Sequence, residues 1–133
     1  MIKLVQCIRR HSGLGVEEFR TAWERYGELL RQVAIELGAV RVTLSTTLET
    51  PLNDALAAAR GSVQAFDGVA EISWPNGAAI LADTAPPATR ARIASLRVLQ
   101  EKFADPVLSA FFFVHEQELL GDIESDIQSA TRP

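Results

Sequence analysis

A change of hydrophobic period near residue 16 constrains the fold of this chain more than any other feature of its sequence. From Val16 to Leu37, apolar residues recur at spacings of three and four, and charged residues lie between them. This spacing places the apolar side chains on one face and predicts an amphipathic helix of about six turns. The apolar positions are Val16, Phe19, Trp23, Tyr26, Leu30, Val33 and Leu37. A helix with one apolar face has to pack against another layer of structure.

Four short segments outside this helix have the composition of β-strands. They run from Lys3 to Arg9, from Val40 to Leu48, from Val69 to Trp74 and from Ser109 to Leu119. Two further segments are predicted to be helical: a short one from Pro51 to Arg60, and a long one that starts near Pro86-Pro87 and stops at Asp105-Pro106. The predicted order is therefore strand, long helix, strand, short helix, strand, long helix, strand.

Two strand-helix-strand units in this order favour an α+β fold. We expect a ferredoxin-like βαββαβ sandwich, in which a four-stranded antiparallel sheet carries the helices on one face. The 133 residues suit one domain, which we expect over residues 1–120, followed by a polar C-terminal tail over 121–133. Because Phe111 to Val114 puts large apolar groups on both sheet faces, we expect a homodimer whose two sheets pack face to face.

Charge and hydropathy disfavour several classes of partner. The chain has 13 Lys and Arg against 17 Asp and Glu, which disfavours capture of nucleic acid or an anionic membrane. Its apolar runs are far shorter than the roughly 20 residues of a membrane-spanning helix, and its first residues lack the regions of a secretory signal. We therefore expect a soluble cytoplasmic protein.

With one cysteine and two histidines, the chain has few of the side chains that bind metal clusters, and we expect no metal or cofactor.

Several stretches of the chain, taken in order, resemble the EthD-domain family, named for ethyl tert-butyl ether degradation. The resemblance runs from Met1 to about Leu119, and its most specific piece is Phe66 to Glu71 with Trp74. Other pieces are Arg9-Arg10, Glu17-Glu18-Phe19 with Trp23, and Pro51-Leu52-Asn53-Asp54. The resemblance implies a dimeric α/β barrel with a cavity between sheet and helices for a small, mostly apolar molecule. Relatives in the dimeric α/β-barrel superfamily, to which this family belongs, include cofactor-free monooxygenases, polyketide cyclases, isomerases and lyases.

One position departs from the family pattern. Many members have His-Gly-Pro-Leu after the helix tryptophan, whereas this chain has Gly27-Glu28-Leu29-Leu30. Two interpretations stay open. Either the loss of an acid or base group means a binding protein or different chemistry, or the missing side chain widens a pocket beside Trp23 and Tyr26.

His115 and Tyr26 are the candidate catalytic residues if the protein is an enzyme. His115 alternates with Phe111 and Phe113 along its strand, and imidazole is the most frequent acid–base group of enzymes, so it is the candidate general acid or base. The Tyr26 hydroxyl could donate a hydrogen bond or a proton inside the pocket. The alternatives are a histidine that faces solvent or a dimer contact, and a tyrosine that closes the core.

Five residues are expected to line the ligand pocket: Trp23, Gly27, Gln6, Glu71 and Trp74. The two tryptophans would form its walls, although both also fit a purely structural role. Gln6 could orient a ligand carbonyl. Glu71 is expected to pair with Arg9 or Arg41 or to face solvent, unless it acts in the cavity as a perturbed carboxylate.

These features point to a protein that binds a small hydrophobic or aromatic molecule. As an enzyme, it would catalyse a cofactor-free proton transfer, cyclisation or oxygenation. The alternative is a non-catalytic ligand carrier or a dimeric interaction module, which the missing helix histidine favours. The sequence leaves open whether the protein is an enzyme.

Overall fold

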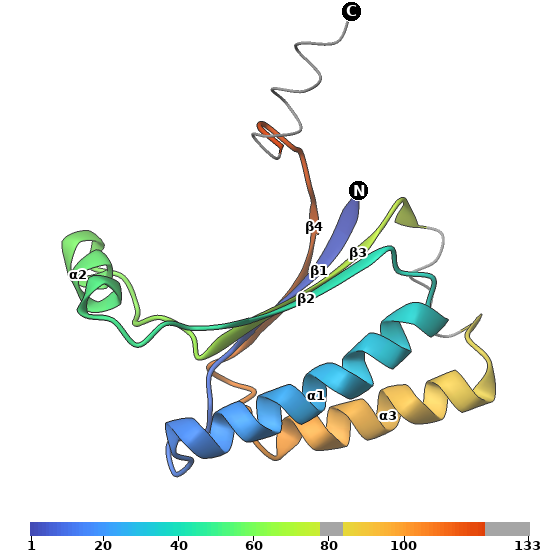
Figure 1. Ribbon diagram of the computed structural model, residues 1–133, viewed down its shortest axis with the longest axis horizontal. Helices are drawn as coiled ribbons and strands as arrows, with labels where there is room; N and C mark the ends of the chain where they lie inside the picture. Colours follow the sequence, from blue (N-terminus) through green and yellow to red (C-terminus); the bar gives the residue numbers. More distant parts are fainter. Residues whose placement is uncertain (78–83, 122–133) are drawn as a thin grey trace, which may run out of the picture.

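The computed structural model describes residues 1–77 and 84–121 (Figure 1). Its elements follow the predicted order: β1 (Ile2–Ile8), α1 (Val16–Glu36), β2 (Arg41–Thr46), α2 (Pro51–Arg60), β3 (Gly68–Trp74), α3 (Pro87–Glu101) and β4 (Ala110–His115). The C-terminal tail expected from the sequence lies outside the described residues from position 122 onward. No helix in the described ranges is long and apolar enough to cross a membrane.

The strands form one four-stranded antiparallel sheet with the order β2-β3-β1-β4. Helices α1 and α3 lie side by side on one face of this sheet, and α2 projects beyond its end (Figure 1). Among the described elements, no helix packs against the opposite face (Figure 1). The expected ferredoxin-like βαββαβ sandwich is confirmed.

Two strands are shorter than the sequence predicted, because each ends where its neighbour ends. Strand β4 pairs with β1 alone, and the last pair in this ladder joins His115 to Ile2. Strand β2 stops at Thr46, opposite the first residue of β3, Gly68. Alternation alone cannot show where a partner strand runs out.

Register determines which side chains share a sheet face. Gln6 lies opposite Ala70 on one side and opposite Phe111 on the other, and all three belong to the face that carries the helices. Val5 lies opposite Glu71 and Phe112, which belong to the other face. We call these the helix face and the open face.

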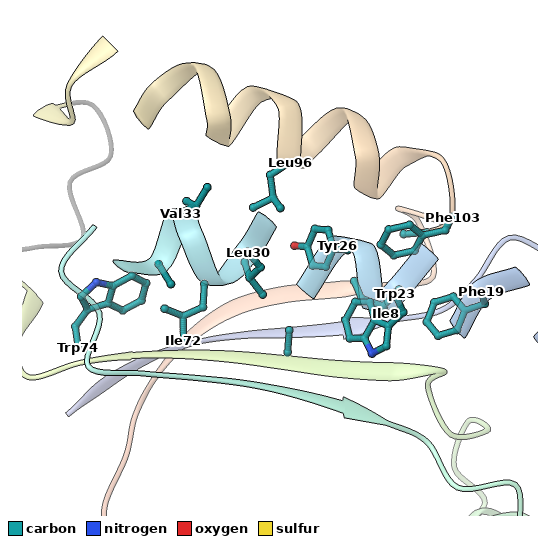
Figure 2. Close-up of a cluster of buried hydrophobic side chains, with 13 residues drawn as sticks. Ile8, Phe19, Trp23, Tyr26, Leu30, Val33, Ile72, Trp74, Leu96 and Phe103 are labelled. Carbon is teal, nitrogen blue, oxygen red and sulfur yellow. The ribbon is translucent and has the colours of Figure 1, made fainter. Parts of the chain in front are cut away.

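The core lies between the helix face and the apolar stripe of α1 (Figure 2). It contains Ile8, Phe19, Trp23, Tyr26, Leu30, Val33, Ala34, Ala70, Ile72, Trp74, Leu96, Phe103 and Ala104. Phe103 is edge-on to the rings of Phe19, Trp23 and Tyr26, with centroid separations of 5.8, 5.9 and 5.4 Å. Such edge-to-face contacts add to the stabilisation from burial.

The close approach of α1 to β3 depends on Gly68. A Cβ atom at this position would lie 2.7 Å from Cε2 of Trp23. The indole is fully buried, stacks between Phe19 and Tyr26, and donates from Nε1 to the Ser45 carbonyl at 3.2 Å. Gly68 belongs to the segment that most resembles the family, and its missing side chain leaves the space that the Trp23 indole occupies.

Candidate functional site

A polar cluster lies inside the otherwise apolar layer between sheet and helices. The Tyr26 hydroxyl donates to Oε1 of Gln6 at 2.5 Å and accepts from Nε2 of Gln100 at 3.0 Å. Nε2 of Gln100 also lies 3.4 Å from Oε1 of Gln6. Tyr26 and Gln6 are buried, so these bonds provide the polar partners that a phenol and an amide need inside a core. We call these three residues the amide–phenol cluster.

Local sequence explains how three different elements build this cluster. Tyr26 follows Trp23 by three residues on the inward stripe of α1. Gln6 lies between Leu4 and Ile8 on the helix face of β1, where an apolar residue would be usual. Gln100 is near the end of α3, and its side chain reaches the other two.

The environment of Tyr26 determines its protonation state. Burial raises the pKa of the phenol to about 12, although hydrogen bonds with Gln6 and Gln100 oppose the rise. At neutral pH the side chain is therefore an uncharged hydrogen-bonding group. It is not available as a base.

An alkaline titration tests this environment directly, because Tyr26 is the only tyrosine of the chain. Absorbance of the phenolate should appear with a midpoint near pH 12 in the folded protein, and near pH 10 in denaturant. Since the pKa is raised on folding, the free energy of unfolding is unaffected by this group below pH 10 and falls as pH rises toward 12. A folded-state midpoint near 10 would show an exposed phenol.

The cluster opens onto a groove of about 300 Å³ between α3 and β4. Its lining residues are Arg97, Gln100, Glu101, Ala104, Pro106 and Phe111. Gln100 belongs to both the groove and the amide–phenol cluster, and Phe111 lies opposite Gln6 in the sheet register. A molecule in this α3–β4 groove would therefore contact an amide whose other side touches Tyr26.

Gly27 lies in a different place. It lines a groove of about 420 Å³ between α1 and β2, together with residues that include Leu30 and Leu44. A Cβ atom at Gly27 would lie 2.8 Å from Cδ2 of Leu44. The space left by the missing side chain is on the β2 side of α1, whereas the Tyr26 hydroxyl bonds to Gln6 of β1 and to Gln100 of α3.

The two candidate catalytic residues do not meet. His115 is exposed at the end of β4, opposite Ile2 on the helix face. Phe111, which lies beside the cluster, is four residues earlier on the same strand, about 13 Å away at the usual rise of a strand. Direct proton transfer between His115 and Tyr26 is therefore not available in this arrangement.

Glu71 belongs to the open face, away from the amide–phenol cluster. Its ion-pair partner is Lys3, with Nζ 3.7 Å from Oε1, and not Arg9 or Arg41 as expected. The reason is position: Lys3 points to the same face from the adjacent strand, whereas Arg9 lies beyond the end of β1 and donates to the carbonyls of residues 64 and 65. Arg41 forms no ion pair with Glu71 among the described residues.

The two tryptophans lie toward opposite ends of the core (Figure 2). Trp74 donates from Nε1 to the Leu37 carbonyl at 3.1 Å and is buried. Trp23 packs over Gly68, six residues earlier on β3. Neither lines the α3–β4 groove, and both indole N–H groups are occupied by backbone carbonyls.

Gln100 was not predicted as a site residue. The signal was a polar residue on an otherwise apolar stripe, since Ile93, Leu96, Gln100 and Phe103 keep helical spacing. Within residues 1–77 and 84–121, no three His, Cys, Asp or Glu side chains are arranged to hold a metal ion.

Solved structures with low sequence identity share this fold. A dimeric protein of unknown function with a ferredoxin-like fold from Bacteroides fragilis has a TM-score of 0.59 at 8% identity, covering 86% of this chain and 95% of its own. A mutant of SnoaB, a cofactor-independent oxygenase from Streptomyces nogalater, has a TM-score of 0.53 at 17% identity, covering 91% of this chain and 97% of its own. At these identities the likeness concerns the fold alone.

The sequence comparisons narrow the assignment further. No curated protein matches the chain. The EthD domain, in contrast, matches residues 11–107, which include α1, the β2–β3 region and α3. The resemblance noted in the sequence is therefore confirmed, and the chain belongs to the EthD domain family.

Proposed function

We propose that the protein binds a small hydrophobic or aromatic molecule in the α3–β4 groove, where a polar atom of the ligand bonds to Gln100. One observation carries this proposal: Gln100 both lines the groove and completes a buried hydrogen-bonded cluster. The groove volume of about 300 Å³ is at the lower end of the range for small-molecule sites. A buried second contact holds the amide in place, which reduces the entropy lost when a ligand binds.

The chemistry of the groove favours a ligand with an apolar body and one carbonyl. Phe111, Ala104 and Pro106 supply apolar walls. The Gln100 amide offers an N–H donor, which a carbonyl oxygen can accept. The other N–H of the same nitrogen is directed at the adjacent oxygens of Tyr26 and Gln6, which holds the amide in a fixed orientation.

Binding without turnover is the form of this function that we favour. A cofactor-free enzyme would need an acid or base within reach of the bound molecule, and His115 lies about four strand residues from Phe111. The raised pKa of Tyr26 keeps it a hydrogen-bonding group at neutral pH. Conversion of a bound ketone, followed by mass spectrometry, would favour the enzyme instead.

We also propose that the protein is a homodimer in which two open faces meet. Each strand directs three side chains to this face. Apolar side chains such as Phe112 lie there beside both acidic and basic side chains. Lys3 forms ion pairs with both Glu71 and Glu116, so the charged part of the face is neutralised before a second copy approaches. The ferredoxin-like protein from Bacteroides fragilis is described as dimeric, which supports a dimer but does not bear on which faces meet.

Calorimetric titration with 1-indanone, a bicyclic aromatic ketone, tests the ligand site. In Gln100→Leu the donor is lost while Tyr26 keeps its bond to Gln6, so we expect the fold to persist and the Kd to rise about tenfold or more. Gln32→Leu, an exposed position on α1, is the matched control and should bind like the original protein. Equal affinity in all three proteins would remove Gln100 from the site.

A further inference from the structure

The segment from Thr47 to Phe66 forms an arm that projects from the sheet. It contains α2, and no residue of this helix is buried. Its exposed apolar residues are Leu48, Leu52, Leu56 and Val63, and three of them are more than two-thirds exposed. Leu52 and Leu56 are four residues apart and so share one side of α2. An isolated helix of ten residues is marginal in water, which makes such a surface costly unless something covers it.

The base of the arm is held in a fixed direction. The guanidinium of Arg9 donates to the carbonyls of Gln64 and Ala65 at 2.9 and 3.2 Å, and its carbon lies 4.8 Å from the ring centre of Phe66. The backbone N–H of Thr47 donates to the Asp67 carbonyl at 3.1 Å. Contacts with Arg9, just beyond the end of β1, and with Asp67 therefore position a segment that adds nothing to the buried core.

The helix itself is also well terminated. Thr50 caps its start by accepting from the N–H of Leu52, and Asn53 donates to the Leu48 carbonyl at 2.8 Å. Between α2 and the returning chain is a groove of about 280 Å³, lined in part by Leu56, Ala57 and Val63. Asn53, Arg60 and Ser62 also line this groove, and its apolar part has room for a large apolar side chain of a partner.

The position of the arm indicates which molecule covers its apolar residues. Figure 1 shows α2 beyond the end of the sheet and on the side away from α1 and α3, which is the side of the open face. A molecule that covers the open face therefore lies next to the arm. Stable interfaces use about 20 to 30 residues from each partner. The open face supplies three positions from each of four strands, so the arm brings the contact surface into this range.

We propose that the arm is an intersubunit clasp, whose apolar side packs against a second copy of this chain docked on the open face. This inference rests on the homodimer of the proposed function. It extends the subunit contact to the arm, which has no residue in the core. The clasp would explain why a solvent-exposed segment is anchored so firmly at its base.

Sedimentation velocity over a range of concentrations tests the clasp. The double variant Leu52→Asp with Leu56→Asp alters only exposed positions, so it should fold normally and raise the Kd of the dimer about tenfold or more. The matched control is Val98→Asp with Val107→Asp, which adds the same charge at exposed positions of α3 and the loop after it and should leave the Kd unchanged. The clasp is wrong if both double variants weaken the dimer equally, or if neither does, as would happen if the arm docked a different protein.

Hydrogen exchange of the α2 amides gives a second readout that needs no variant. Exchange over residues 52–60 should slow about fivefold or more when the protein is concentrated from monomer to dimer. Unchanged exchange in a demonstrated dimer would overturn the clasp but leave the dimer intact. If the protein stays monomeric at every concentration, the clasp and the homodimer are both wrong. Binding of 1-indanone at Gln100 is tested independently of this outcome.

Discussion

Replacing Gly68 with alanine is expected to lower the free energy of unfolding by about 3 kcal/mol, measured by denaturant unfolding followed by circular dichroism. The new Cβ would lie within 2.9 Å of three atoms of the Trp23 indole. That ring has no room to move, because Phe19 and Tyr26 stack on it at 5.7 and 5.5 Å. Gly68 does not have a left-handed backbone conformation, so the loss would come from the contact alone.

Gly27→Ala is the matched control for this prediction. Its Cβ also makes a close contact, but with the end of the Leu44 side chain, which is 36% exposed and free to rotate outward. Removing a glycine from the middle of a helix contributes about 1 kcal/mol of stabilisation. We therefore expect a net change of less than about 1 kcal/mol. A similar large loss in both variants would contradict the packing described around Trp23.

Phe112→Asp is expected to raise the Kd of the proposed homodimer about a hundredfold, measured by sedimentation velocity. Phe112 is on the open face, opposite Val5, and is 45% exposed in the single chain. If two open faces meet, the substitution places an unpaired carboxylate in their contact, which costs much more than the lost apolar area.

The adjacent residue provides the control. Phe113 is 55% exposed but belongs to the helix face, opposite Leu4. Phe113→Asp adds the same charge one residue away and should leave the dimer constant within about twofold. If both variants dissociate the dimer equally, the two open faces are not what joins the subunits.

Hydrophobic period predicted most of the fold. The spacing from Phe19 to Val33 identified α1 and its buried face, and the segment at Gly68 to Trp74 identified β3. Strand ends were less predictable, because they depend on which strand lies alongside, as at His115 and Ile2. The same limitation applies to Glu71: its pairing with Lys3 follows from register, which a single sequence does not contain.

The candidate site was harder to predict than the fold. The sequence predicts separate roles for Tyr26 and Gln6, and the structure joins them in one hydrogen bond. Gln100 was missed, because a polar residue on an apolar helix stripe looks like an imperfection until its partners are known. The chemistry of imidazole makes His115 a candidate in the sequence, and only the register shows how far along β4 it lies from the cluster.

The side-chain amide of Gln100 provides the most direct test of the proposed ligand site. In ¹⁵N-labelled protein, titration with 1-indanone should shift the Gln100 side-chain amide signals together with the backbone amides of Ala104 and Phe111, which line the same groove. The exposed side-chain amide of Gln32 should not shift. Shifts at Gly27 and Leu44 with no change at Gln100 would place the ligand between α1 and β2 and contradict the proposed site.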